Sequence, residues 1–243
     1  MPLFFLFQRQ GTERPEMILT FYERIQNTPD CFSFYFKPET PVTWKAGQYA
    51  TFIIPHDNPD DRGINRFFTI ASSPHEGFIM VTTRYSGESS STFKKAMMSL
   101  EKGKSITFLG PQGEFIIEDY SKSYALIAGG IGITPFRSIL HDLEHNKKIK
   151  DMEIFLIYSS RNNDIVFKDD FDLFAANYSS FKVRYVISPE VCDAGLISVA
   201  IPFFKERTYY ISGPQGMVKA IEEGLISEGI GNEQLNMDYF PGY

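Results

Sequence analysis

The sequence predicts two domains, an antiparallel β-barrel followed by an α/β domain with a parallel, Rossmann-like sheet. Up to about residue 117, short β-branched and aromatic runs alternate with Gly and Pro turns, whereas after residue 120 apolar runs alternate with helical stripes. The length of 243 residues fits one to two domains of about 150 residues each. The boundary is predicted near residues 117–121, which gives domains 1–118 and 119–243.

The first domain is predicted to consist mainly of strands. They lie at residues 17–25, 31–36, 49–54, 67–71, 78–85 and 105–109, with turn-forming clusters between them. One helix is expected, at residues 92–100. Short strands at this spacing are typical of an antiparallel barrel.

The second domain is predicted to alternate strands with helices. Strands are expected at 124–128, 152–158, 181–187, 208–211 and 235–240. Between them, Phe136, Ile139, Leu140 and Leu143 have the spacing of one helical face, and the segments 167–174 and 217–225 carry similar stripes. This alternation predicts a parallel sheet that is covered on both faces.

Composition and charge exclude several classes of function. Twenty-four Lys and Arg against 30 Asp and Glu leave a net charge of -6, which provides no general attraction to nucleic acid. The N-terminal apolar run at 3–7 is far below the roughly 18 residues of a membrane-spanning helix. Cys31 and Cys192 are too few for a disulfide framework, a four-thiolate zinc site or a cysteine-bound iron–sulfur cluster. We therefore expect a reducing cytoplasm, no membrane span and no metal site.

A glycine-rich turn at 129–135 joins the first strand of the second domain to its first helix. Gly129, Gly130 and Gly132 let the backbone approach a ligand closely, and Thr134 is predicted to cap the helix. Backbone N–H groups at such a helix start favour an anion such as a pyrophosphate. The fit to the G-x-G-x-x-G/A fingerprint is incomplete because Pro135 takes the third position, so a purely structural turn is the alternative.

A second turn, at 212–217, again joins an apolar strand to a helix. It contains Gly213, Pro214 and Met217. Two such turns at the carboxyl ends of parallel strands converge where open α/β sheets bind ligands, which favours nucleotide binding over a structural role.

Motifs along nearly the whole chain, from about Met17, resemble the ferredoxin–NADP reductase superfamily. They lie in the expected order at 47–49, 66–74, 110–115, 129–135, 212–217 and 238–243. The resemblance implies an oxidoreductase with an FAD-binding barrel and an NAD(P)-binding α/β domain. It implies hydride transfer from nicotinamide C4 to flavin N5, and the two cysteines leave no iron–sulfur cluster in the same chain.

The family's R-x-Y-[ST] signature corresponds to Arg66, Phe67, Phe68 and Thr69. By resemblance, Arg66 pairs with the flavin pyrophosphate and Thr69 lies near flavin N5. Phe68 replaces the usual Tyr, so it keeps the ring that packs against the isoalloxazine and loses the hydroxyl.

Two further segments resemble the family's FAD contacts. These are Gly87, Ser90, Ser91 and Thr92 at the start of the first-domain helix, and Val81 and Thr82 on the preceding strand. A Ser-rich surface turn followed by an N-cap is the alternative for the first segment.

On the nicotinamide side, Gly129, Gly130, Gly132 and Thr134 match the family's dinucleotide turn. Ser159 and Arg161 follow the second strand, where relatives bind the adenosine ribose. An Arg there can pair with a 2′-phosphate, which favours NADPH slightly over NADH. An ordinary exposed loop arginine is the alternative.

Three residues correspond to the family's catalytic cluster: Thr69, Ser212 and Asp238. Ser212 stands where a Cys is usual, so slower or altered ring positioning is expected. Asp238 is expected to hydrogen-bond near N5 or relay a proton, or else to be a polar strand-end residue. An aromatic near the C-terminus stacks on the flavin in many relatives, and Phe240 is preferred here over Tyr243.

We expect the electrons to pass to a separate acceptor, either a small molecule or an acidic carrier such as ferredoxin or flavodoxin. Lys94, Lys95, Lys102 and Lys104 form a basic stretch that suits such a carrier, although it also fits a solvated lysine face. Two other functions stay open: a flavin reductase that uses free flavin as its substrate, and a non-catalytic nucleotide-binding subunit. The oligomeric state is left open too.

Overall fold

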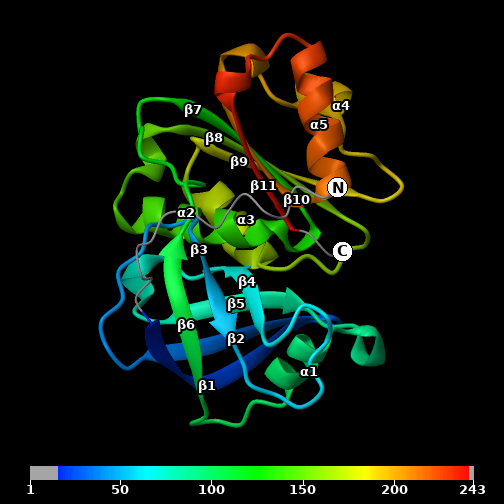
Figure 1. Cartoon of the computed structure of the whole chain (residues 1–243). Coiled ribbons are helices and arrows are strands. Elements are labelled where there is room, and N and C mark those ends of the chain that lie inside the picture. Colours follow the sequence, from blue (N-terminus) through cyan, green and yellow to red (C-terminus); the bar gives the residue numbers. More distant parts are fainter. Residues whose placement is uncertain (1–15, 241–243) are drawn as a thin grey trace.

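The computed structural model describes residues 16–240, with side chains up to Tyr239. Figure 1 shows a β-barrel in the lower half and, above it, a parallel sheet with helices on both faces. The first half of the described chain builds the barrel and the second half builds the α/β layer. The predicted fold class is confirmed.

Six antiparallel strands form the barrel within the described residues. They are β1 (Glu16–Thr28), β2 (Cys31–Pro38), β3 (Tyr49–Ile53), β4 (Asn65–Thr69), β5 (Ile79–Arg84) and β6 (Ser105–Gln112). Their order in the sheet is β4-β3-β6-β1-β2-β5. The two outer strands meet just beyond β4, where the Ala71 N–H donates to the Met80 carbonyl at 2.8 Å. This hydrogen bond brings the sheet round into a barrel.

Aromatic side chains fill the barrel. Phe36, Phe52 and Phe108 are fully buried, and the rings of Phe52 and Phe108 pack edge to face with centroids 5.3 Å apart. The helix α1 (Thr92–Met98) adds Phe93 and Met97 to this core, and it ends two residues before the predicted end. Each buried ring contributes roughly 2–3 kcal/mol through its removal from water, so the many phenylalanines of the first half are mostly core residues.

Five parallel strands form the second sheet within the described residues. They are β7 (Ser123–Gly129), β8 (Glu153–Ser160), β9 (Phe181–Ile187), β10 (Thr208–Pro214) and β11 (Leu235–Phe240), in the order β11-β10-β7-β8-β9. The predicted boundary falls in the connection between β6 and β7. All five strands point the same way, so their carboxyl ends share one edge.

The helices cover this sheet on its two faces. α2 (Thr134–His145) and α3 (Lys168–Asn177) lie between the sheet and the barrel, and α4 (Ala194–Ala200) and α5 (Gln215–Ser227) lie on the far face (Figure 1). The sequence does not predict α4, because it is seven residues long and too short for a periodic stripe. Its start is nevertheless capped, since the Asp193 carboxylate accepts from the Leu196 N–H at 2.8 Å.

A polar network joins α2 to the barrel. The Arg137 guanidinium donates to both carboxylate oxygens of Glu76, at 2.9 and 3.0 Å, and to the Ala71 carbonyl at 3.0 Å. At the next residue, the Ser138 hydroxyl donates to the Ser72 carbonyl at 2.7 Å. The Arg137 and Glu76 side chains are only 10% and 15% exposed. This pairing places the helix that follows the glycine turn at a defined position against the barrel.

Between residues 16 and 240, no helix is both long and apolar enough to cross a lipid bilayer.

Candidate functional site

The glycine turn after β7 is a short 3-10 helix, Gly130–Ile133, that runs directly into α2. Thr134 was expected to cap α2, and this expectation is wrong. Thr134 is instead the first residue of the helix, and its hydroxyl donates back to the Ile131 carbonyl at 3.2 Å. The 3-10 turn extends the helical backbone by one turn, so the residue before α2 is Ile133, which offers no side-chain cap.

The glycines of the two turns have different roles. A Cβ on Gly132 would lie 2.3 Å from the Ser212 carbonyl oxygen, and a Cβ on Gly129 would lie 2.4 Å from the Met217 sulfur. A Cβ on Gly213 would lie 3.1 Å from the Gly129 Cα. These three glycines therefore let the two turns pack against each other.

Gly130 differs from these three glycines. Its φ of +54° lies in the left-handed region, and a Cβ there would have no atom within 4 Å. Gly130 is therefore the glycine of this turn that leaves open space for a ligand beside the backbone.

Ser212 and Asp238 lie side by side on the neighbouring strands β10 and β11. Ser212 is fully buried, and its hydroxyl makes no hydrogen bond of normal geometry to any described residue. Burial raises the pKa of Asp238 to about 6, and the nearby Ser212 hydroxyl offsets part of this increase. A buried hydroxyl without a partner beside a carboxyl that titrates near neutral pH is typical of a functional site.

The barrel reaches the same edge through β5. The turn Gly130–Ile133 contacts β10, β11 and also β5, so the two halves of the chain meet at the glycine turn. Thr82 of β5 is buried, with its hydroxyl 2.8 Å from that of Ser33, and Thr69 at the end of β4 is 4% exposed. Val81 points the other way, into the barrel core.

The predicted pyrophosphate residue, Arg66, lies on the edge strand β4 and stacks over the Phe93 ring, with 5.4 Å between the guanidinium carbon and the ring centroid. Phe68 also packs on Phe93, at 5.8 Å between centroids, and is half-buried. Phe67 points outward and is 63% exposed. The guanidinium Nε of Arg66 is buried without a partner among the described residues.

The hydroxyls at the start of α1 are already engaged within the protein. Ser90 accepts from the Ser86 N–H at 2.8 Å, and Ser91 caps the helix by accepting from the Lys94 N–H at 3.3 Å. Thr92 Oγ1 accepts from the Asp60 N–H at 3.0 Å. Gly87 has a φ of +58° and open space around it, so its backbone is accessible to a ligand.

The remaining predicted residues lie around the nucleotide edge. Ser159 is the second-to-last residue of β8 and is half-buried, and Arg161 directly follows the strand and is exposed. Pro214 ends β10, and Met217 lies in the first turn of α5, directly against Gly129. Phe240 ends β11 in register with Pro214, but its side chain and the whole of Tyr243 lie outside the described residues.

The predicted lysine stretch is not one uniform patch. Lys95 forms an ion pair with Glu88 at 2.7 Å, and burial lowers the pKa of Lys94. Lys102 and Lys104 are exposed. Only these last two present their charges freely to solvent in the way that carrier docking requires.

Sequence reasoning missed two groups that shape the site. Arg137 lies within the apolar stripe of α2, and a charged residue in a buried helical face is a sign of a partner, here Glu76. Asp60 lies in the loop between β3 and β4 and accepts from Arg66. No local pattern marks Asp60, because its partner depends on how the loop folds back.

Two cavities lie outside these sites. One, of about 250 Å³, lies between Trp44, Ile117 and Leu143, and the other, of about 460 Å³, lies near Phe155, Pro202 and Arg207. Neither is lined by a predicted cofactor residue.

The residues present fit the two nucleotides that the family implies. The unpartnered Arg66 Nε and the open space at Gly130 suit phosphate groups on the barrel and sheet sides respectively. The unpartnered Ser212 hydroxyl beside Asp238 suits a polar ring at the edge where the halves meet.

Comparisons with known proteins agree with this arrangement. Residues 126–223 match the family described as the oxidoreductase NAD-binding domain. The chain is 27% identical over 192 residues to NADH-cytochrome b5 reductase 1 of Mortierella alpina, which covers 74% of this chain and 63% of that protein. The chain spans less than two thirds of the length of this and the next curated relatives it matches.

Solved structures show the same fold. A cytochrome P450 reductase of Amycolatopsis has a TM-score of 0.81 at 20% identity, covering 96% of this chain and 72% of that one. Ferredoxin-NADP+ reductase of Plasmodium falciparum has a TM-score of 0.78 at 18% identity, covering 93% of this chain and 96% of that one.

An antiparallel barrel followed by a parallel sheet with two glycine-rich strand ends is the fold that this chain shares with these reductases. The match over part of the α/β half and the shared fold agree with the resemblance to the ferredoxin–NADP reductase superfamily that the motifs predict.

Proposed function

We propose that the chain is an FAD-dependent oxidoreductase that takes electrons from NADH or NADPH and passes them to a separate acceptor. One observation carries this proposal. Ser212 and Asp238, both with unusual buried polar groups, lie side by side at the sheet edge where the turn Gly130–Ile133 touches barrel strand β5. A flavin held by the barrel and a nicotinamide held by the sheet would meet there.

Each half of the chain would bind one nucleotide. On the barrel side, Arg66 would pair with the flavin phosphates, Phe68 would pack near the ring, and Thr69 and Thr82 would lie along its edge. On the sheet side, the Gly130 backbone would approach the nicotinamide nucleotide's phosphates. Hydride transfer from nicotinamide to flavin is the chemistry that the bound cofactors supply.

The residues at the meeting point would orient the rings and handle a proton. Ser212 would orient a ring through its hydroxyl, which makes no hydrogen bond of normal geometry to any described residue. The raised pKa of about 6 lets the Asp238 carboxyl hold or release a proton near neutral pH. The buried walls around Ser212 would exclude water from the rings.

The finer features of the proposal are the coenzyme, the acceptor and the compartment. Exposed Arg161 at the end of β8 supports NADPH over NADH, because a guanidinium pairs well with a 2′-phosphate. Exposed Lys102 and Lys104 support an acidic carrier protein such as ferredoxin or flavodoxin as acceptor. Both cysteines are free and buried, which supports a reducing cytoplasm.

Anaerobic stopped-flow reduction of the purified, FAD-loaded protein tests this function. We expect the flavin absorbance to bleach on mixing with NADPH or NADH, and faster with NADPH at equal concentration. The variant Arg161→Gln should lose the difference between coenzymes and keep its rate with NADH, which serves as the internal control.

The other outcomes separate the competing functions. A colourless protein that consumes NAD(P)H only when riboflavin or FMN is added would identify a flavin reductase. A protein that binds nucleotide and never bleaches its flavin would be a non-catalytic subunit, and the proposal would be wrong.

A further inference from the structure

The loop between β3 and β4 holds a carboxylate against the residue proposed to bind the flavin phosphates. The Asp60 carboxylate accepts from Arg66 Nη2 and from the Arg62 N–H, the latter at 3.1 Å. Arg66 Nη1 donates to two carbonyls of the same loop, those of Arg62 and Gly63, and to the Asn65 carbonyl at the start of β4. Every terminal nitrogen of the Arg66 guanidinium is therefore bonded to its own loop.

A second contact holds Asp60 in this place. Its N–H donates to Thr92 Oγ1 at 3.0 Å. His56 Nδ1 lies 2.7 Å from the Ile54 carbonyl, which only accepts, so Nδ1 carries the proton. In the neutral ring, Nε2 then accepts from the Thr92 hydroxyl at 3.1 Å. Thr92, a second predicted phosphate ligand, is thus also bonded to this loop.

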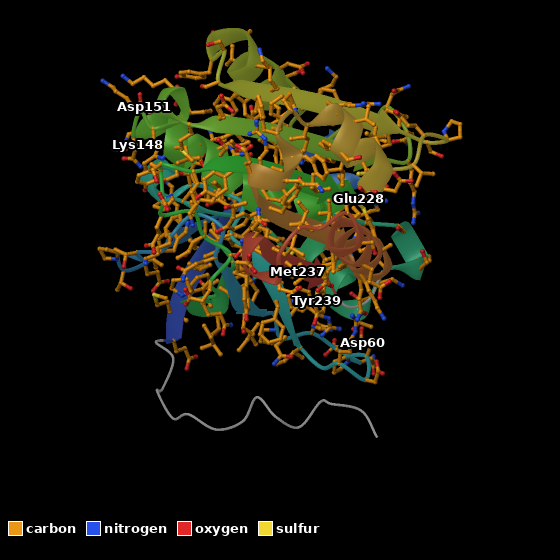
Figure 2. All side chains as sticks on the ribbon, turned by 90° about the horizontal axis from the view of Figure 1, so that it is seen from above. Asp60, Lys148, Asp151, Glu228, Met237 and Tyr239 are labelled. Carbon is orange, nitrogen blue, oxygen red and sulfur yellow. The ribbon has the colours of Figure 1, made fainter. Side chains whose placement is uncertain are left out.

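The pair between Asp60 and Arg66 is partly shielded from water, since the two side chains are 23% and 11% exposed. Burial alone would raise the pKa of Asp60, but the hydrogen bonds from Arg66 and the Arg62 amide outweigh it, and the pKa lies below its usual value. Asp60 is therefore a carboxylate at neutral pH. Figure 2 shows it at the edge of the molecule, far from Lys148 and Asp151.

We propose that Asp60 competes with the flavin phosphates for Arg66, and so lowers the affinity of the chain for FAD and FMN relative to riboflavin. The proposal rests on the proposed function, because it takes Arg66 as the phosphate ligand. A carboxylate offers the guanidinium one negative charge and two acceptor oxygens, the same features that a phosphate offers. Nε is the one guanidinium nitrogen of Arg66 that these contacts leave without a partner. For a phosphate to bind at the Nη2 end of Arg66, it must displace Asp60.

The consequence concerns how firmly flavin is held. Riboflavin has no phosphate, so its binding leaves the Asp60–Arg66 pair intact. FAD gains the two-point contact with the Arg66 guanidinium only by breaking that pair. The net gain in binding free energy is therefore smaller than an arginine without Asp60 would give. Asp60 thus makes the bound flavin more exchangeable.

Flavin titrations of wild type, Asp60→Asn and Asp61→Asn test the proposal. Each protein, stripped of flavin by dialysis against chaotropic salt, is titrated with riboflavin, FMN and FAD, and the quenching of flavin fluorescence gives each Kd. Asp61 is exposed and adjacent, so Asp61→Asn removes the same charge at the next position. Asp60→Asn keeps the side-chain shape, and circular dichroism checks that each variant is folded.

We expect Asp60→Asn to lower the Kd for FAD and FMN about tenfold, the size of one charge-assisted hydrogen bond, and to leave that for riboflavin within about twofold. In an Arg66→Gln background, Asp60→Asn should have no such effect. Asp61→Asn should change the FAD affinity by less than about threefold.

Three results would overturn the proposal: an equal change for riboflavin and FAD, an Asp61→Asn effect as large as that of Asp60→Asn, or weaker FAD binding in Asp60→Asn. If Asp60→Asn does not fold, Asp60→Ala in the same titrations replaces it. If no flavin binds to any of the proteins, the proposed function itself fails, which is a different result from an unchanged selectivity.

Discussion

At the residue scale, the most unusual group of the site is the Ser212 hydroxyl. A buried hydroxyl without a hydrogen bond of normal geometry costs roughly 1–3 kcal/mol, and Ser212 is fully buried beside Asp238. A protein keeps such a group when something outside the folded chain uses it. Ser212 is therefore a position where function and stability oppose each other.

Replacing this hydroxyl should separate the two effects. We expect Ser212→Ala to raise the free energy of unfolding by about 1 kcal/mol, since an unsatisfied polar group is removed, and to slow the reduction of bound flavin by the coenzyme. Urea denaturation and stopped-flow absorbance measure the two quantities.

Ser138 supplies the matched control for Ser212. Its hydroxyl donates to the Ser72 carbonyl at 2.7 Å, so Ser138→Ala should lower the free energy of unfolding by about 1 kcal/mol. If both alanine variants are destabilised alike, Ser212 has a partner within the fold and the argument fails.

Asp238 predicts a pH dependence of stability. An aspartate titrates near pH 3.9 in an unfolded chain, and burial raises the pKa of Asp238 to about 6 in the fold. Between these values the folded state binds more protons, so this residue's contribution to stability falls as pH rises from about 4 to 6 and stays lower above that. Asp238→Asn should therefore be more stable relative to wild type at pH 7 than at pH 4, by roughly 2 kcal/mol.

Urea denaturation of both proteins across that pH range measures the difference. A difference in unfolding free energy that stays constant from pH 4 to pH 7 would show that the Asp238 carboxyl titrates as it does in the unfolded chain.

At the scale of elements, the two glycine-rich strand ends combine packing with binding. The turn Gly130–Ile133 lies against β10 so closely that Gly132 has no room for a Cβ and Gly213 has little, whereas Gly130 has open space. The sequence pattern alone treats these glycines alike. In the structure, close packing explains three of them, Gly129, Gly132 and Gly213.

Alanine substitutions at two of these positions should differ in kind. Gly132→Ala places a Cβ 2.3 Å from the Ser212 carbonyl oxygen, so we expect a loss of about 3 kcal/mol or more. Gly130→Ala adds only the strain of a left-handed backbone, about 1 kcal/mol, and should weaken nucleotide binding. Chemical denaturation gives the first comparison, and thermal shift with added NADP+ gives the second.

The stabilities of Gly130→Ala and Gly132→Ala test whether the two glycines have different roles. If Gly130→Ala proves less stable than Gly132→Ala, or if NADP+ raises its melting temperature as much as that of wild type, Gly130 does not face the nucleotide.

At the scale of the whole molecule, the relation of the two halves depends on Arg137. Burial alone would raise the pKa of Glu76, but hydrogen bonding and charge from Arg137 outweigh it and the pKa lies below its usual value. The pair sits between α2 and the barrel, so it aligns the nucleotide turn with β5.

Breaking this pair should be costly. Arg137→Met leaves the Glu76 carboxylate buried without its partner, and we expect a loss of about 3 kcal/mol together with slower flavin reduction. The double variant Glu76→Gln/Arg137→Met should lose less than the two single variants together, since no charge is then left unpaired.

The exposed pair of Arg184 and Glu190 is the control for this effect. Its side chains are 44% and 45% exposed, so Arg184→Met should cost less than about 1 kcal/mol. Additive effects of the two substitutions at Glu76 and Arg137 in urea denaturation would contradict the coupling.

The sequence predicted every strand of both sheets to within a few residues, because β-branched and aromatic runs between turns are local signals. It missed α4, which is too short for a periodic stripe, and it placed the cap of α2 at Thr134, where the 3-10 turn continues into the helix. Both errors concern short segments whose hydrogen bonds depend on neighbouring elements.

The amino-acid sequence by itself determined the order of the two halves, the fold class and the positions of the motifs, since these depend on local pattern and spacing. Only the tertiary structure decided which groups meet. It paired Asp60 with Arg66, joined Arg137 to Glu76 across the two halves, and left the Ser212 hydroxyl without a partner beside Asp238. Such contacts join residues far apart in the chain or depend on how a loop folds back, and burial sets their strength, so no local pattern contains them.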